Sequence, residues 1–306
     1  MKLGNLIESQ QLTPDILFSL FKSADEIRAN PKLFSDVLKG KVVATLFYEP
    51  STRTRLSFES ATEKLGGSII STENAKEFSS SIKGESMEDT ARIVAAYADC
   101  IVMRHYEEGS AKKAGGVINI PMINAGDGKG QHPTQALLDL YTVYREIGRV
   151  DNFKIAFVGD LASGRTVRSL CYLIGKFSNI EVVFVSPENL KMKDDIKEYL
   201  ERHNVNFREE QELSKLLPEM DVIYMTRIQK ERISVEDYEK AKGRFVINKD
   251  NLNLVKKEAI IMHPLPHVEE IDLSLDIEQN DKRVAYFRQA ENGLFIRMAL
   301  LKMLLE

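Results

Sequence analysis

Short apolar segments alternate with helical segments along almost the whole chain, and this alternation restricts the fold more than any other feature. The strand-like segments are rich in Val, Ile, Leu and Phe, and stretches with apolar residues at helical spacing separate them. Continuous apolar runs of this kind are typical of parallel strands that helices cover on both faces. The sequence therefore predicts an α/β fold with parallel sheets.

The alternation runs through two halves of the chain. The expected strands are Lys41–Tyr48, Ser68–Ser71, Cys100–Met103, Val117–Asn119, Lys154–Val158, Glu181–Val185, Val222–Met225 and Ala259–Met262. The expected helices, after one that begins at Pro14, are Thr52–Leu65, Ser86–Ala98, His132–Ile147, Thr166–Phe177, Lys191–His203, Ser234–Lys242 and a last one from about Asn292. A chain of 306 residues has room for two domains of about 150 residues each. We therefore expect two doubly wound parallel-sheet domains, 1–148 and 149–290, with the active site in the cleft between them. Residues 291–306 are expected to form a C-terminal helix that packs back on the first domain.

Composition argues against several classes of protein. The formal net charge is −4, which gives no general attraction for nucleic acid. The two cysteines, Cys100 and Cys171, lie in apolar segments and are interpreted as buried thiols, and their spacing does not suggest a metal site. The N-terminal segment lacks the apolar core of a signal peptide, and no run approaches the roughly 20 apolar residues of a membrane span. We therefore expect a cytoplasmic protein that binds neither membrane nor nucleic acid.

A cationic turn, Ser51-Thr52-Arg53-Thr54-Arg55, follows the first expected strand and opens the next helix. Free backbone N–H groups at the start of a helix bind anions, and the helix dipole favours negative charge there. Hydroxyl groups of Ser51, Thr52 and Thr54 add donors, and a guanidinium such as that of Arg53 can bind two phosphate oxygens at once. The turn is therefore interpreted as a phosphate site.

Other polar residues follow strands elsewhere in the chain, where ligands of open parallel sheets bind. Arg104 comes directly after the Cys100–Met103 strand, and His132 and Gln135 follow the glycine-rich segment 125–130. Arg165 and Arg227 follow two strands of the second half. If these two arginines face those of the first domain, they make a cleft with two anion sites.

The polar segment 72–85 interrupts the alternation. It has almost no apolar period, and a loop of this length is usually functional or disordered. Two interpretations remain open from the pattern: a solvated surface loop, or a lid that carries Ser79 and Lys83.

Motifs of several other catalytic classes are absent from the sequence. It contains no H-E-x-x-H, no G-x-S-x-G, no Walker A loop and no G-x-G-x-x-G. We therefore expect no metal and no cofactor. Many fixed positive donors and few acid–base candidates favour catalysis by positioning and electrostatic stabilisation.

An ordered set of motifs covers nearly the whole chain. It comprises Ser51–Arg55, Lys83-Gly84-Glu85, Val102–His105, Asn124–Gly128, His132–Gln135, Gly159–Thr166, Tyr224–Arg232 and His263–Pro266. In this set the chain resembles the aspartate/ornithine carbamoyltransferase family, and in particular its aspartate-specific members. The resemblance implies transfer of a carbamoyl group from carbamoyl phosphate to the amine of L-aspartate, a step of pyrimidine biosynthesis.

The resemblance also implies roles for individual residues. The carbamoyl phosphate ligands would be Ser51, Thr52, Arg53, Thr54, Arg104, His132, Gln135 and the backbone of Leu265 and Pro266. The aspartate ligands would be Lys83, Arg165, Arg227 and Gln229. The catalytic residues would be Arg53, Thr54, Lys83, Arg104 and His132. Ser79 and Lys83 would enter the active site of a neighbouring subunit, which implies a homotrimer. A separate regulatory chain is left open.

Two alternatives and two departures accompany the resemblance. An ornithine carbamoyltransferase would typically have His-Cys-Leu-Pro where this chain has His263-Pro264-Leu265-Pro266. A catalytically inactive paralogue that serves in assembly should have lost site residues that are present here. His267 stands where Arg is usual, and Ser163 stands where Tyr sometimes occurs. His267 leaves open whether cleft closure uses the usual ion pairs.

Overall fold

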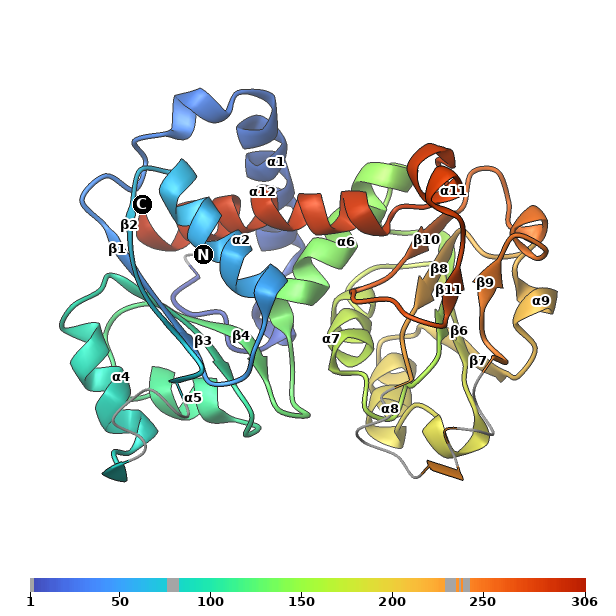
Figure 1. Ribbon diagram of the computed structural model, residues 1–306, viewed down its shortest axis with the longest axis horizontal. Coiled ribbons are helices and arrows are strands. Elements are labelled where there is room, and N and C mark those ends of the chain that lie inside the picture. The colour runs from blue at the N-terminus through green and yellow to red at the C-terminus, as the bar shows by residue number, and fades with distance from the viewer. Residues whose placement is uncertain (1–2, 76–82, 229–234, 237, 239–242) are drawn as a thin grey trace. The chain divides into compact units, whose positions relative to one another are not determined.

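The structure, a computed structural model, describes residues 3–75, 83–228, 235–236, 238 and 243–306. The chain divides into two compact units. The first unit comprises Met1–Leu138 and Glu291–Glu306, and the second comprises Asp139–Ala290. Each boundary falls inside a helix, α6 (Pro133–Ile147) or α12 (Tyr286–Leu305), rather than in the turn at Gly148 (Figure 1). In the described part of the chain, no helix is both long and apolar enough to cross a lipid bilayer.

The first unit contains a four-stranded parallel sheet with the order β2-β1-β3-β4. Its strands are β1 (Val42–Phe47), β2 (Ser68–Glu73), β3 (Cys100–His105) and β4 (Met122–Asp127). The other elements that the structure describes in this unit, besides its parts of α6 and α12, are η1 (Ser9–Gln11), α1 (Pro14–Ala29), η2 (Pro31–Phe34), α2 (Thr52–Lys64), α4 (Met87–Ala95) and α5 (Ser110–Gly115).

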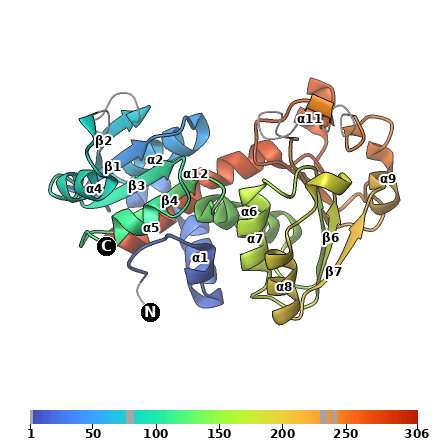
Figure 2. The ribbon, with the colours of Figure 1, turned by 90° about the horizontal axis from the view of Figure 1, so that it is seen from below.

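Helices cover both faces of this sheet (Figure 2). Alternate side chains of each strand point to opposite faces, so each strand packs against helices on both sides. Ala44 and Leu46 of β1 belong to an apolar cluster that includes residues of α4 and α5. Thr45 points the other way, toward α2, and donates a hydrogen bond to Glu59 at 3.0 Å. The apolar runs of the sequence are therefore buried on both sides, as expected for a parallel sheet.

The C-terminal part of α12 packs in the first unit against α1. Arg28 of α1 lies 3.2 Å from the carboxylate of Glu291. Its guanidinium also lies over the ring of Phe295, 4.1 Å from the centroid. Residues from the two ends of the chain thus stabilise the same unit.

The second unit contains a five-stranded parallel sheet with the order β10-β8-β5-β6-β7 and a two-stranded sheet of β11 and β9. The strands are β5 (Phe153–Val158), β6 (Ile180–Val185), β7 (Asn206–Glu210), β8 (Val222–Met225), β9 (Ile247–Asn248), β10 (Ile260–Met262) and β11 (Ile271–Asp272). Among its described residues, and besides its parts of α6 and α12, the helices are α7 (Arg165–Ile174), η4 (Glu188–Leu190), α8 (Asp194–Arg202), α9 (Leu213–Leu216), η6 (Leu252–Leu254) and α11 (Leu275–Asn280).

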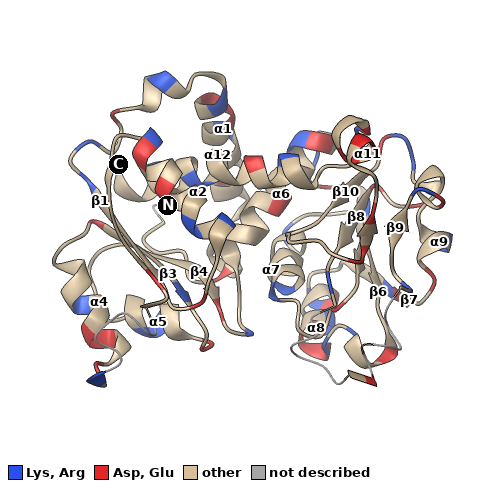
Figure 3. Ribbon diagram, in the orientation of Figure 1, with Lys and Arg blue, Asp and Glu red and all other residues tan. Residues whose placement is uncertain are grey.

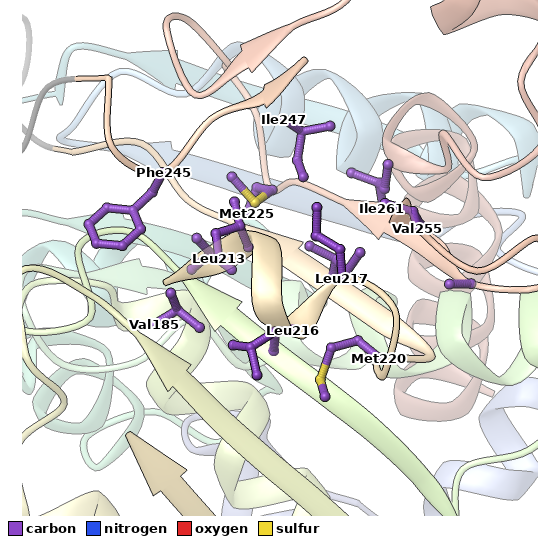
Figure 4. Packing of buried hydrophobic residues seen from close by; sticks show 14 of the residues in the cluster. Val185, Leu213, Leu216, Leu217, Met220, Met225, Phe245, Ile247, Val255 and Ile261 are labelled. Atoms are coloured by element: carbon purple, nitrogen blue, oxygen red, sulfur yellow. The ribbon is translucent and has the colours of Figure 1, made fainter. Parts of the chain in front are cut away.

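One apolar cluster fills the face of this sheet that α9 covers (Figure 4). Leu213, Leu216, Leu217 and Met220 recur at helical spacing, and all four are buried. They pack with Val185 and other strand residues in the same cluster. Local periodicity in the sequence therefore becomes one side of the core.

The predicted α/β class with two parallel-sheet domains is confirmed, but some elements differ. The strand expected at Val117–Asn119 is wrong: the strand beside β3 is β4, which begins after Pro121 and includes Gly126 and Asp127. The charged edge strand β7 was not predicted, because its polar residues are typical of a loop. Most of the helix expected at Ser234–Lys242 lies outside the described residues.

Both cysteines are fully buried, Cys100 in β3 and Cys171 in α7, in agreement with the expectation from their apolar surroundings. Burial raises the pKa of each thiol. Neither thiol is available as a thiolate near neutral pH.

Gly159, directly after β5, is expected to be essential for folding of the second unit. Its φ is +118°, and a Cβ atom there would lie 2.2 Å from the carbonyl oxygen of Thr226. Gly159→Ala should lower the free energy of unfolding by about 3 kcal/mol or more, measured in denaturant. Gly148→Ala is the control, because Gly148 also has a positive φ but open space around it. Equal losses in the two variants would contradict the steric explanation.

Candidate active site

In each large sheet, the strands that follow the first one in sequence are added on one side of it and then on the other, so the direction of winding reverses there. The reversal lies between β1 and β3 in the first unit and between β5 and β8 in the second. Loops that leave neighbouring strands in opposite directions open a crevice at their carboxyl ends, where ligands of such sheets bind. The predicted anion-binding residues follow these four strands, or lie on the loops beside them.

The turn after β1 contains two arginines in different surroundings. Arg55 pairs with Glu59 at 3.2 Å and with Glu73 at 2.8 Å, so its charge is used within the fold. Arg53 is exposed and has no acidic partner among the described residues. Partial desolvation lowers the pKa of Arg53, although a guanidinium stays charged near neutral pH. Arg53 is therefore the arginine of the turn that can receive an anion.

The remaining residues of the turn begin helix α2. Ser51 is the N-cap residue and is half-buried, and Thr52 is exposed. Thr54 is buried. Backbone N–H groups in this first turn have no partner in the preceding turn of helix, so they suit an anion. Figure 3 shows basic residues on the first turns of α2.

Arg104, at the end of β3, contacts residues at the carboxyl ends of the neighbouring strands β1 and β4. Its carbonyl oxygen accepts the N–H of Tyr48 at 2.9 Å. Its guanidinium lies 2.8 Å from the carboxylate of Glu49 and 3.4 Å from the carbonyl oxygen of Ala125. The structure therefore places Arg104 beside the turn that carries Arg53. The Glu49 contact was not predicted.

His105, next to Arg104, makes contacts within the fold rather than presenting a free ring to a ligand. Its Nδ1 accepts the N–H of Glu107 at 3.0 Å and lies 2.9 Å from the hydroxyl of Ser110. Its ring packs against Tyr48, with 4.7 Å between centroids. Burial lowers the pKa of His105, although the nearby carboxylates of Glu107, Asp127 and Glu49 act in the opposite direction. These contacts stabilise the loop after β3.

Asp127 organises the glycine-rich loop after β4. Its carboxylate accepts the N–H of Gly109 at 2.7 Å, the N–H of Gln131 at 2.9 Å and the side-chain amide of Asn124 at 3.1 Å. These bonds fix the path of the chain toward His132. Sequence reasoning did not select Asp127, although an aspartate between two glycines is a signal of a defined turn.

His132 and Gln135 lie at the start of α6 and are both almost fully buried. The carbonyl oxygen of His132 accepts the N–H of Gln135 at 3.0 Å, so the two residues share the first turn. The hydroxyl of Thr134 lies 3.3 Å from Nδ1 of His132. If Thr134 donates in this contact, the proton of the neutral ring is on Nε2, where it can be donated to an oxygen atom.

The second unit presents Arg165 and Arg227 after β5 and β8. Arg165 is the first residue of α7, and Arg227 follows Thr226, whose N–H is bonded to Val158 at 2.8 Å. Both arginines are half-buried. In the loop before α7, Asp160 accepts the N–H of Ser163 at 2.9 Å. The two arginines thus flank the reversal in strand order.

Three predicted residues lie in or beside segments that the structure does not describe. Ser79 and Gln229 are outside the described residues. Lys83 is described and exposed, and it is followed by Gly84 with a φ of +87°. Within the described residues, no group of three or more His, Cys, Asp or Glu side chains could hold a metal ion.

The loop after β10 carries Leu265 and Pro266. Leu265 has a φ of +54°, which is unusual for a residue with a side chain, and the Leu265–Pro266 peptide bond is cis. The side chain of Leu265 packs against the apolar cluster of the second unit, whereas Pro266 is exposed. His267 lies 3.2 Å from the carboxylate of Glu278.

Glu270 should make folding stability depend on pH in the acid range. Burial raises the pKa of this carboxyl group, but bonds from His263 and from the backbone lower it more, so the net pKa is below its usual value. A depressed pKa in the folded state contributes stability above the pKa of the unfolded state, about 4.3. This contribution is lost as the pH falls through the lower folded-state value. The unfolding free energies of the parent and Glu270→Gln should therefore converge as the pH falls below about 4, measured in urea. A constant difference would contradict this prediction.

Two family models match the chain. The model described as "Aspartate/ornithine carbamoyltransferase, carbamoyl-P binding domain" matches residues 5–145. The model described as "Aspartate/ornithine carbamoyltransferase, Asp/Orn binding domain" matches residues 151–304.

Individual proteins are similar over nearly the full chain. Aspartate carbamoyltransferase 3, chloroplastic, of Pisum sativum is 54% identical over 99% of this chain and 78% of its own length. The solved catalytic subunit of Methanocaldococcus jannaschii aspartate transcarbamoylase is 47% identical, covers 99% of this chain and 98% of its own, and has a TM-score of 0.90. The Trypanosoma cruzi aspartate transcarbamoylase, solved with N-(phosphonacetyl)-L-aspartic acid, is 37% identical over 99% of this chain and 96% of its own, with a TM-score of 0.92.

Proposed function

The chain belongs to the aspartate/ornithine carbamoyltransferase family, and we propose that it transfers the carbamoyl group of carbamoyl phosphate to the amine of L-aspartate. The products are N-carbamoyl-L-aspartate and phosphate, as in pyrimidine biosynthesis. One observation carries the proposal: each sheet places cationic side chains at its own reversal of strand order. Two separate anion sites fit one phosphate-bearing and one dicarboxylate substrate.

In this proposal most ligands of carbamoyl phosphate come from the first unit, and Leu265 and Pro266 come from the second. Arg53 and the start of α2 bind the phosphate, with hydroxyl donors from Ser51, Thr52 and Thr54. Arg104 lies beside the same turn, and its contact with Glu49 keeps the guanidinium at the end of β3. His132 donates to the carbonyl oxygen. The two N–H groups of the carbamoyl NH2 are shared between the side-chain oxygen of Gln135 and the backbone carbonyl oxygens of Leu265 and Pro266.

The second unit binds L-aspartate through Arg165, Arg227 and Gln229, and Lys83 assists. The two arginines follow neighbouring strands, which suits two carboxylates at one crevice. A guanidinium can hold both oxygens of a carboxylate.

The chemistry then follows from fixed donors. The uncharged amine of aspartate attacks the carbamoyl carbon, and a new N–C bond forms. The carbonyl oxygen becomes an oxyanion, which His132, Arg104 and Thr54 stabilise. The C–O bond to phosphate breaks, and Arg53 binds the phosphate as it leaves. The proton of the amine passes to this phosphate. No protein base is needed in this scheme.

The decisive experiment is an assay of the purified chain with carbamoyl phosphate and either L-aspartate or L-ornithine, with the products identified by mass spectrometry. Carbamoylation of aspartate alone supports the proposal. Carbamoylation of ornithine alone would replace it with the other branch of the family. If calorimetry detected no binding of carbamoyl phosphate, the chain would be an inactive assembly paralogue.

We further propose a homotrimer in which Ser79 and Lys83 enter the neighbouring active site. The exposed side chain of Lys83 agrees with such a role. Sedimentation should give the mass of three chains, and the mass of one chain in an active preparation would refute the proposal. We also propose a cytoplasmic location for this chain, in contrast to the plant relatives, which are described as chloroplastic.

A further inference from the structure

His263 is a buried histidine at the end of β10 that the proposed chemistry does not use. Both ring nitrogens have partners in the second unit. Nδ1 accepts the backbone N–H of Leu265 at 2.8 Å, and Nε2 lies 2.9 Å from a carboxylate oxygen of Glu270. Because Nδ1 accepts a hydrogen bond, the proton of the neutral ring is on Nε2, the nitrogen that lies beside Glu270.

Glu270 is itself held in place. The carboxylate oxygen that lies beside His263 also accepts the N–H of Val268 at 3.1 Å. The backbone of Glu270 is paired with Ile247, whose N–H donates to its carbonyl oxygen at 3.0 Å. Glu270 is only 7% exposed. The acceptor for Nε2 is therefore part of the packed interior and can fix the orientation of the ring.

The backbone of His263 is fixed from the opposite side. Gln289 accepts its N–H at 2.9 Å and donates to Asp139 at 2.6 Å. Tyr224 donates to the other oxygen of Asp139 at 2.7 Å. This continuous set of hydrogen bonds runs from Tyr224 in β8 through Asp139 in the middle of α6 and Gln289 in the first turn of α12 to His263 after β10. It leaves little freedom for the imidazole.

The bond from Leu265 to Nδ1 acts on an unusual backbone conformation. A leucine with a φ of +54° persists only where surrounding contacts hold it. The direction of the carbonyl groups of Leu265 and Pro266 depends on this conformation. Together with the side chain of Gln135, these two carbonyl groups are the proposed acceptors for the carbamoyl NH2.

We propose that His263, supported by Glu270, is a positioning residue that aims the carbonyl oxygens of Leu265 and Pro266 at the carbamoyl NH2. This inference rests on the proposed function. It makes His263 a determinant of specificity for an NH2 group on the acyl carbon. A methyl group in that position gains nothing from two aligned acceptors.

Acetyl phosphate is the matched probe, because it has a methyl group where carbamoyl phosphate has NH2. In the parent chain, carbamoyl phosphate should bind more tightly than acetyl phosphate. His263→Gln retains an amide donor near Glu270 but has no acceptor at the position of Nδ1. This variant should lose about tenfold or more in affinity for carbamoyl phosphate and little for acetyl phosphate, measured by calorimetry.

His263→Asn is the control variant. Its amide oxygen can occupy the position of Nδ1 and accept the N–H of Leu265, while the contact with Glu270 is lost. It should keep most of the preference for carbamoyl phosphate. The unfolding free energies of both variants are measured at the same time, so that a general loss of stability is seen separately.

Three outcomes would be informative. Equal preferences for carbamoyl phosphate in the Gln and Asn variants would overturn the role of Nδ1. A loss of affinity for both ligands in the Gln variant would reduce His263 to a structural residue and overturn the proposal. If the parent chain bound neither ligand, the proposed function itself would fail, and this result is distinct from the other two.

Discussion

His132→Ala should lower kcat by about 10²–10³-fold, since the loss of one oxyanion donor typically costs about 3–4 kcal/mol. His132 is 3% exposed at the start of α6, and the hydroxyl of Thr134 lies 3.3 Å from its Nδ1. If this hydroxyl donates to Nδ1, the ring proton is on Nε2, which can donate to the oxyanion. Steady-state kinetics with saturating carbamoyl phosphate and aspartate measure the effect. KM values should change much less than kcat, because the oxyanion exists only in the transition state.

A variant with an amide donor in place of the imidazole provides the control for this prediction. His132→Gln places an amide N–H near the position of Nε2 and should recover part of the lost rate. If a folded His132→Ala protein turned over within a few-fold of the parent, His132 would have no role in stabilising the oxyanion.

Arg53→Ala should lower kcat/KM by about a thousandfold, since two charge-assisted hydrogen bonds to phosphate contribute about 2 kcal/mol each. Arg53 has no acidic partner among the described residues, so its guanidinium is available to the ligand. Arg53→Lys keeps the charge but not the two parallel N–H groups, and it should fall between the parent and the alanine variant.

Arg55→Ala is the matched control in the same turn. Arg55 forms ion pairs with Glu59 and Glu73, and both pairs are partly exposed to solvent. Removal of the guanidinium should therefore lower the unfolding free energy by about 1 kcal/mol. Its kcat/KM should stay within a few-fold of the parent. If Arg55→Ala lost activity as severely as Arg53→Ala, the two arginines would not have separate roles.

The class of fold could be predicted because apolar runs such as Lys154–Val158 and Glu181–Val185 lie inside parallel sheets. Two strands were predicted poorly for opposite reasons. The segment near Val117 has β-forming residues, but the sheet uses Met122–Asp127, whose glycine and aspartate have low β propensity; pairing with β3 outweighs propensity there. β7 is an edge strand with charged residues, so its sequence is typical of a loop.

The candidate site could be predicted in part because it follows strand ends. The carboxyl ends of parallel strands meet at one edge of a sheet, so Arg53, in a cationic turn after a strand, could be selected from the sequence, whereas the role of Arg104 needed the family resemblance as well. The order of strands could not be predicted, and it is this order that makes β1 and β3 neighbours. The contacts of Glu49, Asp127 and Glu270 depend on loop geometry, which no periodicity encodes.

The burial of both cysteines has a practical consequence. Cys100 and Cys171 are the only thiols in the chain, and reagents that attack thiolates cannot reach them in the folded protein. Cysteines introduced at exposed positions, such as Leu33→Cys in the first unit and Leu275→Cys in the second, would then be the only sites of labelling. A pair of fluorescent dyes attached there would report the distance between the two units as each substrate binds, with both natural cysteines left in place.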